Sequence, residues 1–339
     1  PQPHATTPHP GPPATRRHGP DPSLTATSQP GIVGSLRMKL AALALSAFLL
    51  ASCAPKIAGQ PKPTAPPTPS PAAQQPSPPS ASPSPASTHV FVIVMENRTS
   101  SQVSGNGYIA TLAAQYGVAS NYHGVSHHSL PNYLALTSGS TWSIADDAFH
   151  ALPAGGLGAE LTTAGISWRA YMEGMTRTCF NSPYPYALKH DPFAYYGSKC
   201  PPQVVPFTQF ATDMAGDAPR FVWITPNLCH DGHDCSNAVA EAWLAQTVPV
   251  ILGSSAWRDN GVLFITWDEG EDTANSVLTL VVQPNPPTHE SSQPYDHYSL
   301  LATIEDQLGV PRLGLAAQAT PMSDLLAMPS PPRQRIQSG

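Results

Sequence analysis

The stretch His89-Val-Phe-Val-Ile-Val-Met95, followed directly by Glu96-Asn97-Arg98, decides the fold of this chain. An unbroken run of β-branched and aromatic side chains is typical of a strand that is fully buried. We therefore expect the first strand of a sheet here, with a carboxylate and an amide at its carboxyl end.

Similar apolar runs recur at 221–225, 262–267 and 277–282, and helical patterns lie at 109–116, 157–164, 237–252 and 299–308. Strands that alternate with helices predict an α/β domain built on a mostly parallel central sheet. In such sheets ligands gather at the carboxyl ends of the strands. The polar residues at those ends are therefore the first candidates for a functional site.

The region before this domain has a different composition. Roughly half of the 41 prolines precede Thr88, and residues 54–88 are so rich in Pro, Ser and Ala that they predict a disordered tether. Residues 1–37 are polar and predict a disordered extension that precedes the true start at Met38. We expect the folded domain at 89–328 and a flexible tail at 329–339.

Residues 38–53 have the pattern of a signal peptide. Met38-Lys39 precedes an apolar run over 40–51, which is too short to span a hydrocarbon core of about 30 Å. The run ends in Leu50-Ala51-Ser52-Cys53, which resembles the lipobox of bacterial lipoproteins, in which the cysteine is lipidated. We therefore expect an extracytoplasmic protein of the bacterial cell envelope, anchored to the membrane through Cys53. An ordinary secretory signal with a chance cysteine is the alternative.

Four further cysteines, Cys179, Cys200, Cys229 and Cys235, form an even set that predicts disulfides in an exported protein. Spacing alone leaves three pairings open. The pairs Cys179–Cys200 and Cys229–Cys235 are favoured because each closes a local loop rich in Gly, Pro, Asn or Asp. A four-cysteine zinc site competes with this prediction, although no C-x-x-C spacing is present.

The charge balance restricts the class of partner. From His89 onward the chain has 21 acidic and 10 basic side chains, a formal charge near −11. Nucleic acid is therefore not expected as a partner, because its phosphates would be repelled. A bound divalent cation would instead relieve part of this repulsion.

Two of the buried strands are followed by acidic residues. Glu96 and Asn97 follow the first strand, and Asp268 and Glu269 follow the strand at 262–267. Acids packed together would repel each other or take up protons unless a cation lay between them. Carboxylate and amide oxygens predict a site for a shared divalent metal ion.

Three further segments contain residues suited to catalysis. The loop Cys229-His-Asp-Gly-His-Asp-Cys235 follows the strand at 221–225, and Tyr295-Asp-His-Tyr298 precedes a predicted helix. His127-His-Ser-Leu-Pro-Asn-Tyr133 places Ser129 just before a proline that suits a first helical turn. Backbone N–H groups at a helix start can hold phosphate oxygens, and a metal ion could activate the serine hydroxyl.

Taken in order, these motifs resemble the phosphoesterase family that contains bacterial acid phosphatases and phospholipase C enzymes. The matching segments are Met95-Glu-Asn-Arg98, Ser129-Leu-Pro-Asn-Tyr-Leu-Ala-Leu-Thr-Ser-Gly139, Pro226-Asn-Leu-Cys-His-Asp-Gly-His-Asp234, Thr266-Trp-Asp-Glu269 and Tyr295-Asp-His-Tyr-Ser-Leu-Leu301. The resemblance implies an alkaline-phosphatase-like three-layer sandwich and a phosphoesterase catalytic domain over 89–328.

The resemblance also implies roles for individual residues. Ser129 is similar to the family's nucleophile, and the predicted metal ligands are Glu96, Asn97, Asp268, Glu269 and Asp234. His233 and His297 are the predicted catalytic histidines, one of which would protonate the leaving group. His128 stands where the family often has proline, and the Cys229–Cys235 loop is shorter than in the phospholipase C branch. These departures leave the substrate and the roles of His230 and Asp231 open.

The sequence thus predicts a metal-dependent hydrolase that cleaves phosphoesters through a phosphoseryl intermediate. The metal remains open among Mg, Ca, Mn, Zn and Fe. An acid phosphatase-like monoesterase is favoured because the domain lacks a long apolar lid, and the expected substrate is a small phosphoester or a phospholipid headgroup. The alternatives are a phospholipase C-type phosphodiesterase and a surface lipoprotein that keeps the fold without turnover. A sulfatase is disfavoured because Tyr133 stands where the sulfatase motif needs arginine.

Overall fold

The computed structural model describes residues 88–105, 107–284 and 289–327. The predicted extension, the signal peptide with Cys53, the tail and all but the last residue of the tether lie outside the described residues. Within the described ranges, no helix combines the length and the apolar character needed to cross a bilayer.

The described residues form one sheet in the order β4-β3-β5-β1-β6-β7-β2-β8, with β9 also paired to β2. The strands are β1 (Val90–Met95), β2 (Gly117–His123), β3 (Trp168–Met172), β4 (Val204–Pro206), β5 (Phe221–Thr225), β6 (Val262–Trp267), β7 (Ser276–Val282), β8 (Glu290–Ser291) and β9 (Tyr295–Asp296). Every pairing is parallel except the two made by β7. The prediction of a mostly parallel sheet is confirmed.

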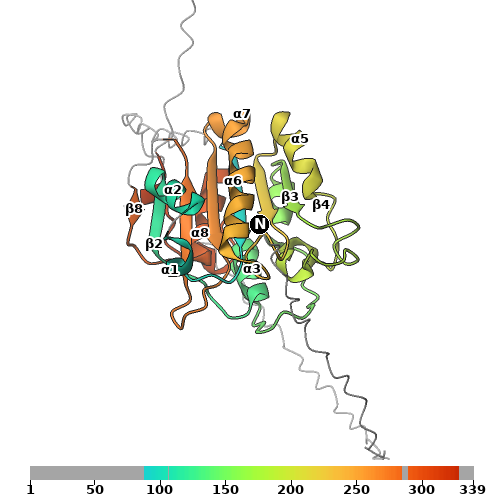
Figure 1. The fold of residues 1–339 in the computed structure, drawn as a ribbon. Coiled ribbons are helices and arrows are strands. Elements are labelled where there is room, and N and C mark those ends of the chain that lie inside the picture. Colours follow the sequence, from blue (N-terminus) through green and yellow to red (C-terminus); the bar gives the residue numbers. More distant parts are fainter. Residues whose placement is uncertain (1–87, 106, 285–288, 328–339) are drawn as a thin grey trace, which may run out of the picture. The chain divides into compact units, whose positions relative to one another are not determined.

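Helices cover both faces of this sheet. They are α1 (Ser100–Val103), α2 (Tyr108–Gln115), α3 (Ser129–Ser138), α4 (Gly156–Thr163), α5 (Phe210–Ala215), α6 (Asn237–Gly253), α7 (Ser255–Arg258) and α8 (His297–Leu308). In one layer α6 packs against α2, α5 and α7, and in the other α3 packs against α4 and α8. Figure 1 shows α6 in front of the strands and α8 behind them. The arrangement is the predicted three-layer sandwich.

Five short 3₁₀ helices lie in the described connections. They are η1 (Leu188–His190), η2 (Pro192–Ala194), η3 (Phe207–Gln209), η4 (Gly314–Ala317) and η5 (Ser323–Leu325).

The core lies on both sides of the central strands. Every side chain of β1, β5 and β6 is buried, as expected for strands with helices on each face. The largest fully buried side chains include Trp223 and Trp267. The central strands are therefore held rigidly, and so are the residues that follow directly at their carboxyl ends.

Both predicted disulfides are present, which excludes the alternative of a four-cysteine zinc site. Cys179 is bonded to Cys200 and Cys229 to Cys235, with Cα–Cα distances of 5.5 and 4.7 Å. Each bond closes a loop next to the carboxyl edge of the sheet. The two loops carry several of the polar residues described below.

Candidate active site

The acidic residues predicted after β1 and β6 lie side by side. The two strands are parallel neighbours, with Met95 opposite Trp267. The backbone N–H of Asn97 donates to Asp268 Oδ1 at 3.0 Å, and the left-handed backbone of Asn97 (φ 46°) turns the chain at this point. The sheet therefore brings together Glu96, Asn97, Asp268 and Glu269, as the sequence predicted.

Ser129 is the first residue of α3 and lies directly over these acids. Its Oγ donates to Glu96 Oε2 at 3.1 Å and lies 3.4 Å from Glu269 Oε1. The Lys189 ammonium lies 3.5 Å from Ser129 Oγ. The positive end of the α3 dipole stabilises negative charge on the serine oxygen. The nearby carboxylates can accept the hydroxyl proton.

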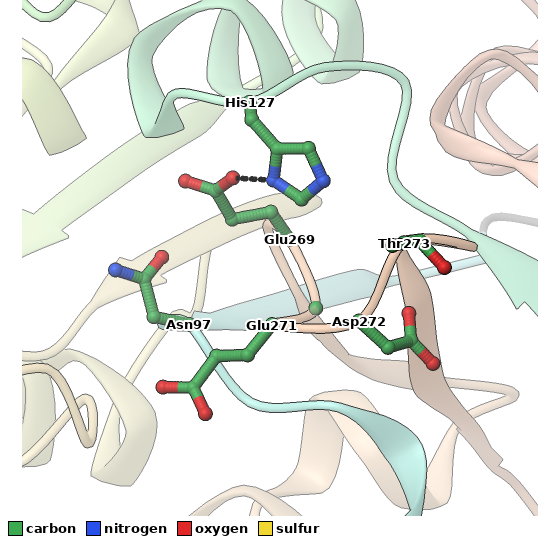
Figure 2. A pocket seen from close by; sticks show the side chains of 7 residues that line it. Asn97, His127, Glu269, Glu271, Asp272 and Thr273 are labelled. Carbon is green, nitrogen blue, oxygen red and sulfur yellow. Dashed lines mark hydrogen bonds and ion pairs between the residues drawn. The ribbon is translucent and has the colours of Figure 1, made fainter.

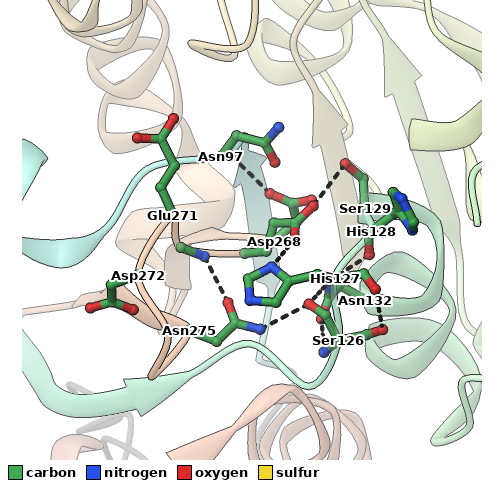
Figure 3. Close-up of polar contacts among 12 residues, drawn as sticks. Asn97, Ser126, His127, His128, Ser129, Asn132, Asp268, Glu271, Asp272 and Asn275 are labelled. Atoms are coloured by element: carbon green, nitrogen blue, oxygen red, sulfur yellow. Dashed lines mark hydrogen bonds and ion pairs between the residues drawn. The ribbon is translucent and has the colours of Figure 1, made fainter. Parts of the chain in front are cut away.

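Two asparagines hold the loop that leads into Ser129. Asn132 accepts from the backbone N–H groups of Val125 and Ser126 and donates to the carbonyls of Ser126 and His128, at 2.9 to 3.0 Å. Asn275 donates to the Ser126 carbonyl and accepts from Gly270 N–H, both at 2.8 Å. Figure 3 shows these contacts fixing the loop against the segment after β6. The position of Ser129 is thus set by hydrogen bonds that use both the side-chain oxygen and the side-chain nitrogen of Asn132.

A buried histidine from η1 supplies a positive charge to the cluster. His190 Nε2 lies 3.1 Å from Glu96 Oε1, and Nδ1 lies 3.4 Å from Asp231 Oδ2. Burial alone would lower the pKa of His190, but the charges of Glu96 and Asp231 raise it to about 10. The ring stacks on Tyr133 of α3 at 5.1 Å between centroids. The two flanking carboxylates therefore favour the charged, imidazolium form of His190.

The same contacts divide the acids into two kinds. Burial would raise the pKa of Glu96, but His190 lowers it below its ordinary value. Burial, followed by the charge of Glu96, raises the pKa of Asp268 well above its usual range, and burial raises that of Glu269 as well. One histidine cannot neutralise all of these groups, so Asp268 tends to retain a proton unless another cation is present.

The donor set of this cluster fits a hard divalent cation. Asn97 Oδ1 and Asp268 Oδ2 are buried without a hydrogen-bond partner, and such orphaned oxygens are the ligands that Mg²⁺, Ca²⁺ and Mn²⁺ take. No three histidine, cysteine, aspartate or glutamate side chains within 88–105, 107–284 and 289–327 are grouped closely enough to hold an ion by themselves. An amide oxygen from Asn97 and the Ser129 hydroxyl would have to complete the set.

Lys189 connects the cluster to a further acid. Its ammonium donates to Asp147 Oδ2 at 2.9 Å, while Asp147 Oδ1 accepts from Leu130 N–H at 3.0 Å. Burial would raise the pKa of Asp147, but the Leu130 and Lys189 contacts hold it below its usual value. A cation beside Ser129 Oγ is suited to bind a phosphoryl oxygen.

An open cleft borders the cluster on one side. It has a volume of about 580 Å³ and is lined by Asn97, His127, Glu269, Gly270, Glu271, Asp272 and Thr273. Figure 2 shows His127 bonded to Glu269 at the cleft wall. A substrate can therefore reach the acidic cluster from solvent.

Asp234 and His233 do not join the acidic cluster. Their side chains are partly exposed and bonded to each other at 2.7 Å. The His233 ring nevertheless lies 6.2 Å from the His190 ring, on the positive side of the site. From the same loop it is Asp231 that points inward, fully buried, and its backbone carbonyl accepts from Glu96 N–H.

His297 lies beneath the site at the start of α8. The ring is fully buried, with Nε2 bonded to the Asp268 carbonyl and Nδ1 to the Tyr122 hydroxyl at 2.9 Å. Burial lowers its pKa to about 4. With both nitrogens bonded inside the protein, the structure gives His297 a positioning role toward Asp268 and no free atom for a substrate.

The sequence did not single out Lys189, His190 or Asp147, and it left the role of Asp231 open. Lys189, His190 and Asp231 contact Ser129 or Glu96, and Asp147 contacts Lys189. These partners are distant in the chain, so no local spacing marked the four residues. The one available signal was the Lys189-His190-Asp191 run inside the Cys179–Cys200 loop.

Comparison with known proteins shows the family of the chain. The profile of the phosphoesterase family matches residues 106–311. The chain is 30% identical over 252 residues to a phosphatidylinositol-3-phosphatase of Mycobacterium tuberculosis, covering 70% of this chain and 82% of that protein. It is 28% identical over 243 residues to a phosphate-repressible acid phosphatase of Penicillium chrysogenum, covering 66% of this chain and 59% of the fungal protein.

The fold has a solved counterpart in a protein of the alkaline phosphatase superfamily from Vibrio parahaemolyticus. The TM-score is 0.50 with 12% sequence identity, over 72% of this chain and 74% of that one. This likeness confirms the predicted fold class.

Proposed function

The chain belongs to the phosphoesterase family and hydrolyses phosphoesters, and we propose that it is a metal-dependent, acid phosphatase-like monoesterase that works through a phosphoseryl intermediate. The observation that carries this proposal is the position of Ser129 Oγ, between two carboxylates and an ammonium group. A serine that only capped a helix would not need these three charged neighbours.

In the first step Ser129 Oγ forms a bond to phosphorus and the bond from phosphorus to the alcohol oxygen breaks. In this proposal Glu96 Oε2, which accepts a hydrogen bond from the Ser129 hydroxyl at 3.1 Å, takes the serine proton. Lys189 holds a phosphoryl oxygen, and His190 keeps Glu96 ionised for its task. His233, partly exposed beside His190, is the acid that protonates the departing alcohol and then the base that activates water.

Glu96, Asn97, Asp268 and Glu269 would hold the divalent cation, together with the Ser129 hydroxyl. Once bound, the cation would lower the proton affinity of that hydroxyl and offset charge on the phosphoryl oxygens. Asp234 is left out of this set because its carboxylate is bonded to His233 outside the cluster.

The experiment measures hydrolysis by the full chain of an aryl phosphomonoester and a choline phosphodiester across pH, before and after chelation. Monoester turnover that is lost on chelation and restored by one added cation supports the proposal. A dominant diester activity would favour the phospholipase C branch. Absence of turnover from folded protein with every metal would favour a binding module.

Ser129→Ala tests the nucleophile, with Ser126→Ala as the matched control. Ser126 is three residues away, and its hydroxyl donates to the neighbouring His127 carbonyl at 3.2 Å. We expect Ser129→Ala to abolish turnover and the ³²P label trapped on the acid-quenched protein, while Ser126→Ala keeps both. Retained turnover in Ser129→Ala would remove the serine from this role.

We also propose that the enzyme is anchored to the bacterial envelope through lipidated Cys53. The lipobox-like Leu50-Ala51-Ser52-Cys53 supports this proposal. Partition of the wild-type protein into detergent, together with release of Cys53→Ala into the aqueous phase, would bear it out. Equal partition of both proteins would contradict it.

A further inference from the structure

Two exposed aromatic rings from distant segments meet on the surface, Phe149 and Phe180. Phe149 is 46% exposed and Phe180 is 40% exposed, and their ring centroids lie 5.6 Å apart in an edge-to-face arrangement. Phe149 also rests on the buried ring of Tyr195 at 5.1 Å. Adjacent large apolar side chains left in water on a folded surface often mark a binding site.

The segment that carries Phe149 is bonded to the nucleophile segment at two points and to Lys189 at a third. His128 Nδ1 contacts the Ala145 carbonyl at 2.9 Å, and Asp147 binds both Leu130 N–H and the Lys189 ammonium. Leu130 follows Ser129 directly, and Lys189 contacts the Ser129 hydroxyl. Phe149 lies two residues beyond Asp147 and rests on Tyr195, which packs in one buried cluster with Leu130, the residue after Ser129.

Phe180 is fixed from the other side. It follows Cys179, whose disulfide to Cys200 and buried position anchor the backbone there. Because rigid neighbours already hold both rings in place, a ligand that contacts them does not have to immobilise them. The entropic cost of binding is therefore small. Aromatic side chains also offer a large apolar area at low entropic cost.

We infer that Phe149 and Phe180 form a subsite for the leaving group, and that the substrate is a phosphomonoester of an alcohol with an aromatic or bulky aliphatic group. This inference rests on the proposed function, since it places the phosphoryl group at Ser129 and Lys189. The alcohol oxygen leaves with a proton while its apolar part stays in contact with the two rings. The ring pair then adds binding energy that a small alcohol such as ethanol cannot obtain.

A single organic group fits the pair better than an anionic bilayer does. The chain from His89 onward has a formal charge near −11, which opposes close approach to anionic lipids. Phe149 leans on Tyr195, which keeps it close to the nucleophile segment.

The test compares benzyl phosphate with ethyl phosphate, two monoesters of primary alcohols that differ chiefly in the ring. The variants are Phe149→Ala, Phe180→Ala and the double variant, and Trp142→Ala is the matched control. Trp142 is 40% exposed, like Phe180, but its indole bonds to Ser138 at the far end of α3, about 13.5 Å along the helix from Ser129.

We expect the double variant to lower kcat/KM for benzyl phosphate about tenfold, with kcat/KM for ethyl phosphate unchanged within about twofold and Trp142→Ala like wild type for both. Loss of the same factor for both esters, or for neither, would overturn the subsite while leaving the phosphatase proposal intact. A defect seen only with a phosphomonoester lipid in vesicles would also overturn it and assign the rings to a membrane surface.

A binding measurement separates the inference from turnover. Benzylphosphonate and ethylphosphonate cannot be hydrolysed at a phosphoester bond, so calorimetry reports their affinity whether or not the enzyme is active. We expect tighter binding of benzylphosphonate by wild type and loss of that preference in the double variant. Equal affinity of wild type for the two phosphonates would refute the subsite.

Discussion

Replacement of His190 by glutamine tests whether its positive charge compensates the buried carboxylates of the site. The imidazolium lies between Glu96 and Asp231, and all three side chains are at most 1% exposed. Removing its charge leaves two buried carboxylates facing each other without a cation. Removal of one partner of a buried ion pair costs about 3–5 kcal/mol, so we expect the free energy of unfolding to fall by that amount.

The assay is urea unfolding in chelator at neutral pH, followed by fluorescence of the six tryptophans. The control is His233→Gln, a partly exposed histidine near His190, for which we expect a loss of about 0.5 kcal/mol or less. Addition of Asp231→Asn to the His190→Gln chain removes one uncompensated charge and should restore part of the loss, by about 0.5–3 kcal/mol.

The proposed metal site adds a second readout to this test. A divalent cation should stabilise His190→Gln more than wild type, because the variant has one positive charge fewer beside the same acids. A loss below about 1 kcal/mol for His190→Gln, equal to that of His233→Gln, would contradict a charge-compensating role. The acidic cluster would then not lack a positive charge.

Three further outcomes are expected. Saturation of wild type with its divalent cation at about 100 times the dissociation constant should raise the free energy of unfolding by about 2.7 kcal/mol; an unchanged urea midpoint would contradict a metal site. Serine substitution of Cys229 and Cys235 should lower the free energy of unfolding by about 2 kcal/mol, and removal of the Cys179–Cys200 disulfide, which closes a longer loop, should lower it by about 3 kcal/mol. A larger loss for the Cys229–Cys235 pair in urea unfolding would contradict loop entropy as the cause. Burial raises the pKa of fully buried Glu305 to about 8, so its protonated form adds stability that is present below about pH 4.5 and lost as pH rises to 8. Glu305→Gln should remove this decline of at most about 1.4 kcal/mol per pH unit, and identical pH profiles of the two chains would refute it.

The sequence predicted the central part of the fold because that part depends on local composition. β1, β5 and β6 are continuous apolar runs, and such runs of five or six β-branched and aromatic residues are typical of fully buried strands. β2 and β3 were missed: β2 contains Ser120 and Asn121, and its burial is irregular along the strand, whereas β3 has Arg169 within only five residues. The antiparallel direction of β7 depends on a turn after β6 that leaves no mark on strand composition.

The acidic part of the site was predictable for a related reason. Residues that follow adjacent parallel strands must meet at one edge, so Glu96 and Asp268 were placed together by the fold itself. The choice between Asp231 and Asp234 depended on loop geometry: Gly232 adopts a left-handed conformation (φ 98°) and His233 N–H bonds back to Asp231. Lys189 and His190 lie in a segment without periodicity, and only the folded chain shows what they face.

The central position of β1 has a consequence for the nascent chain. β1 precedes the other strands of the described sheet in the chain, but both of its neighbours, β5 and β6, lie far downstream, from Phe221 and Val262 onward. An uncharged strand of high β-propensity must therefore remain unpaired during most of translation or export, and such segments are prone to aggregate. Folding dominated by these late, long-range pairings is slow. The acids that meet at Glu96 and Asp268 can come together only when β6 has joined, so an emerging chain has neither the complete sheet nor the assembled site until almost all of the domain has been made.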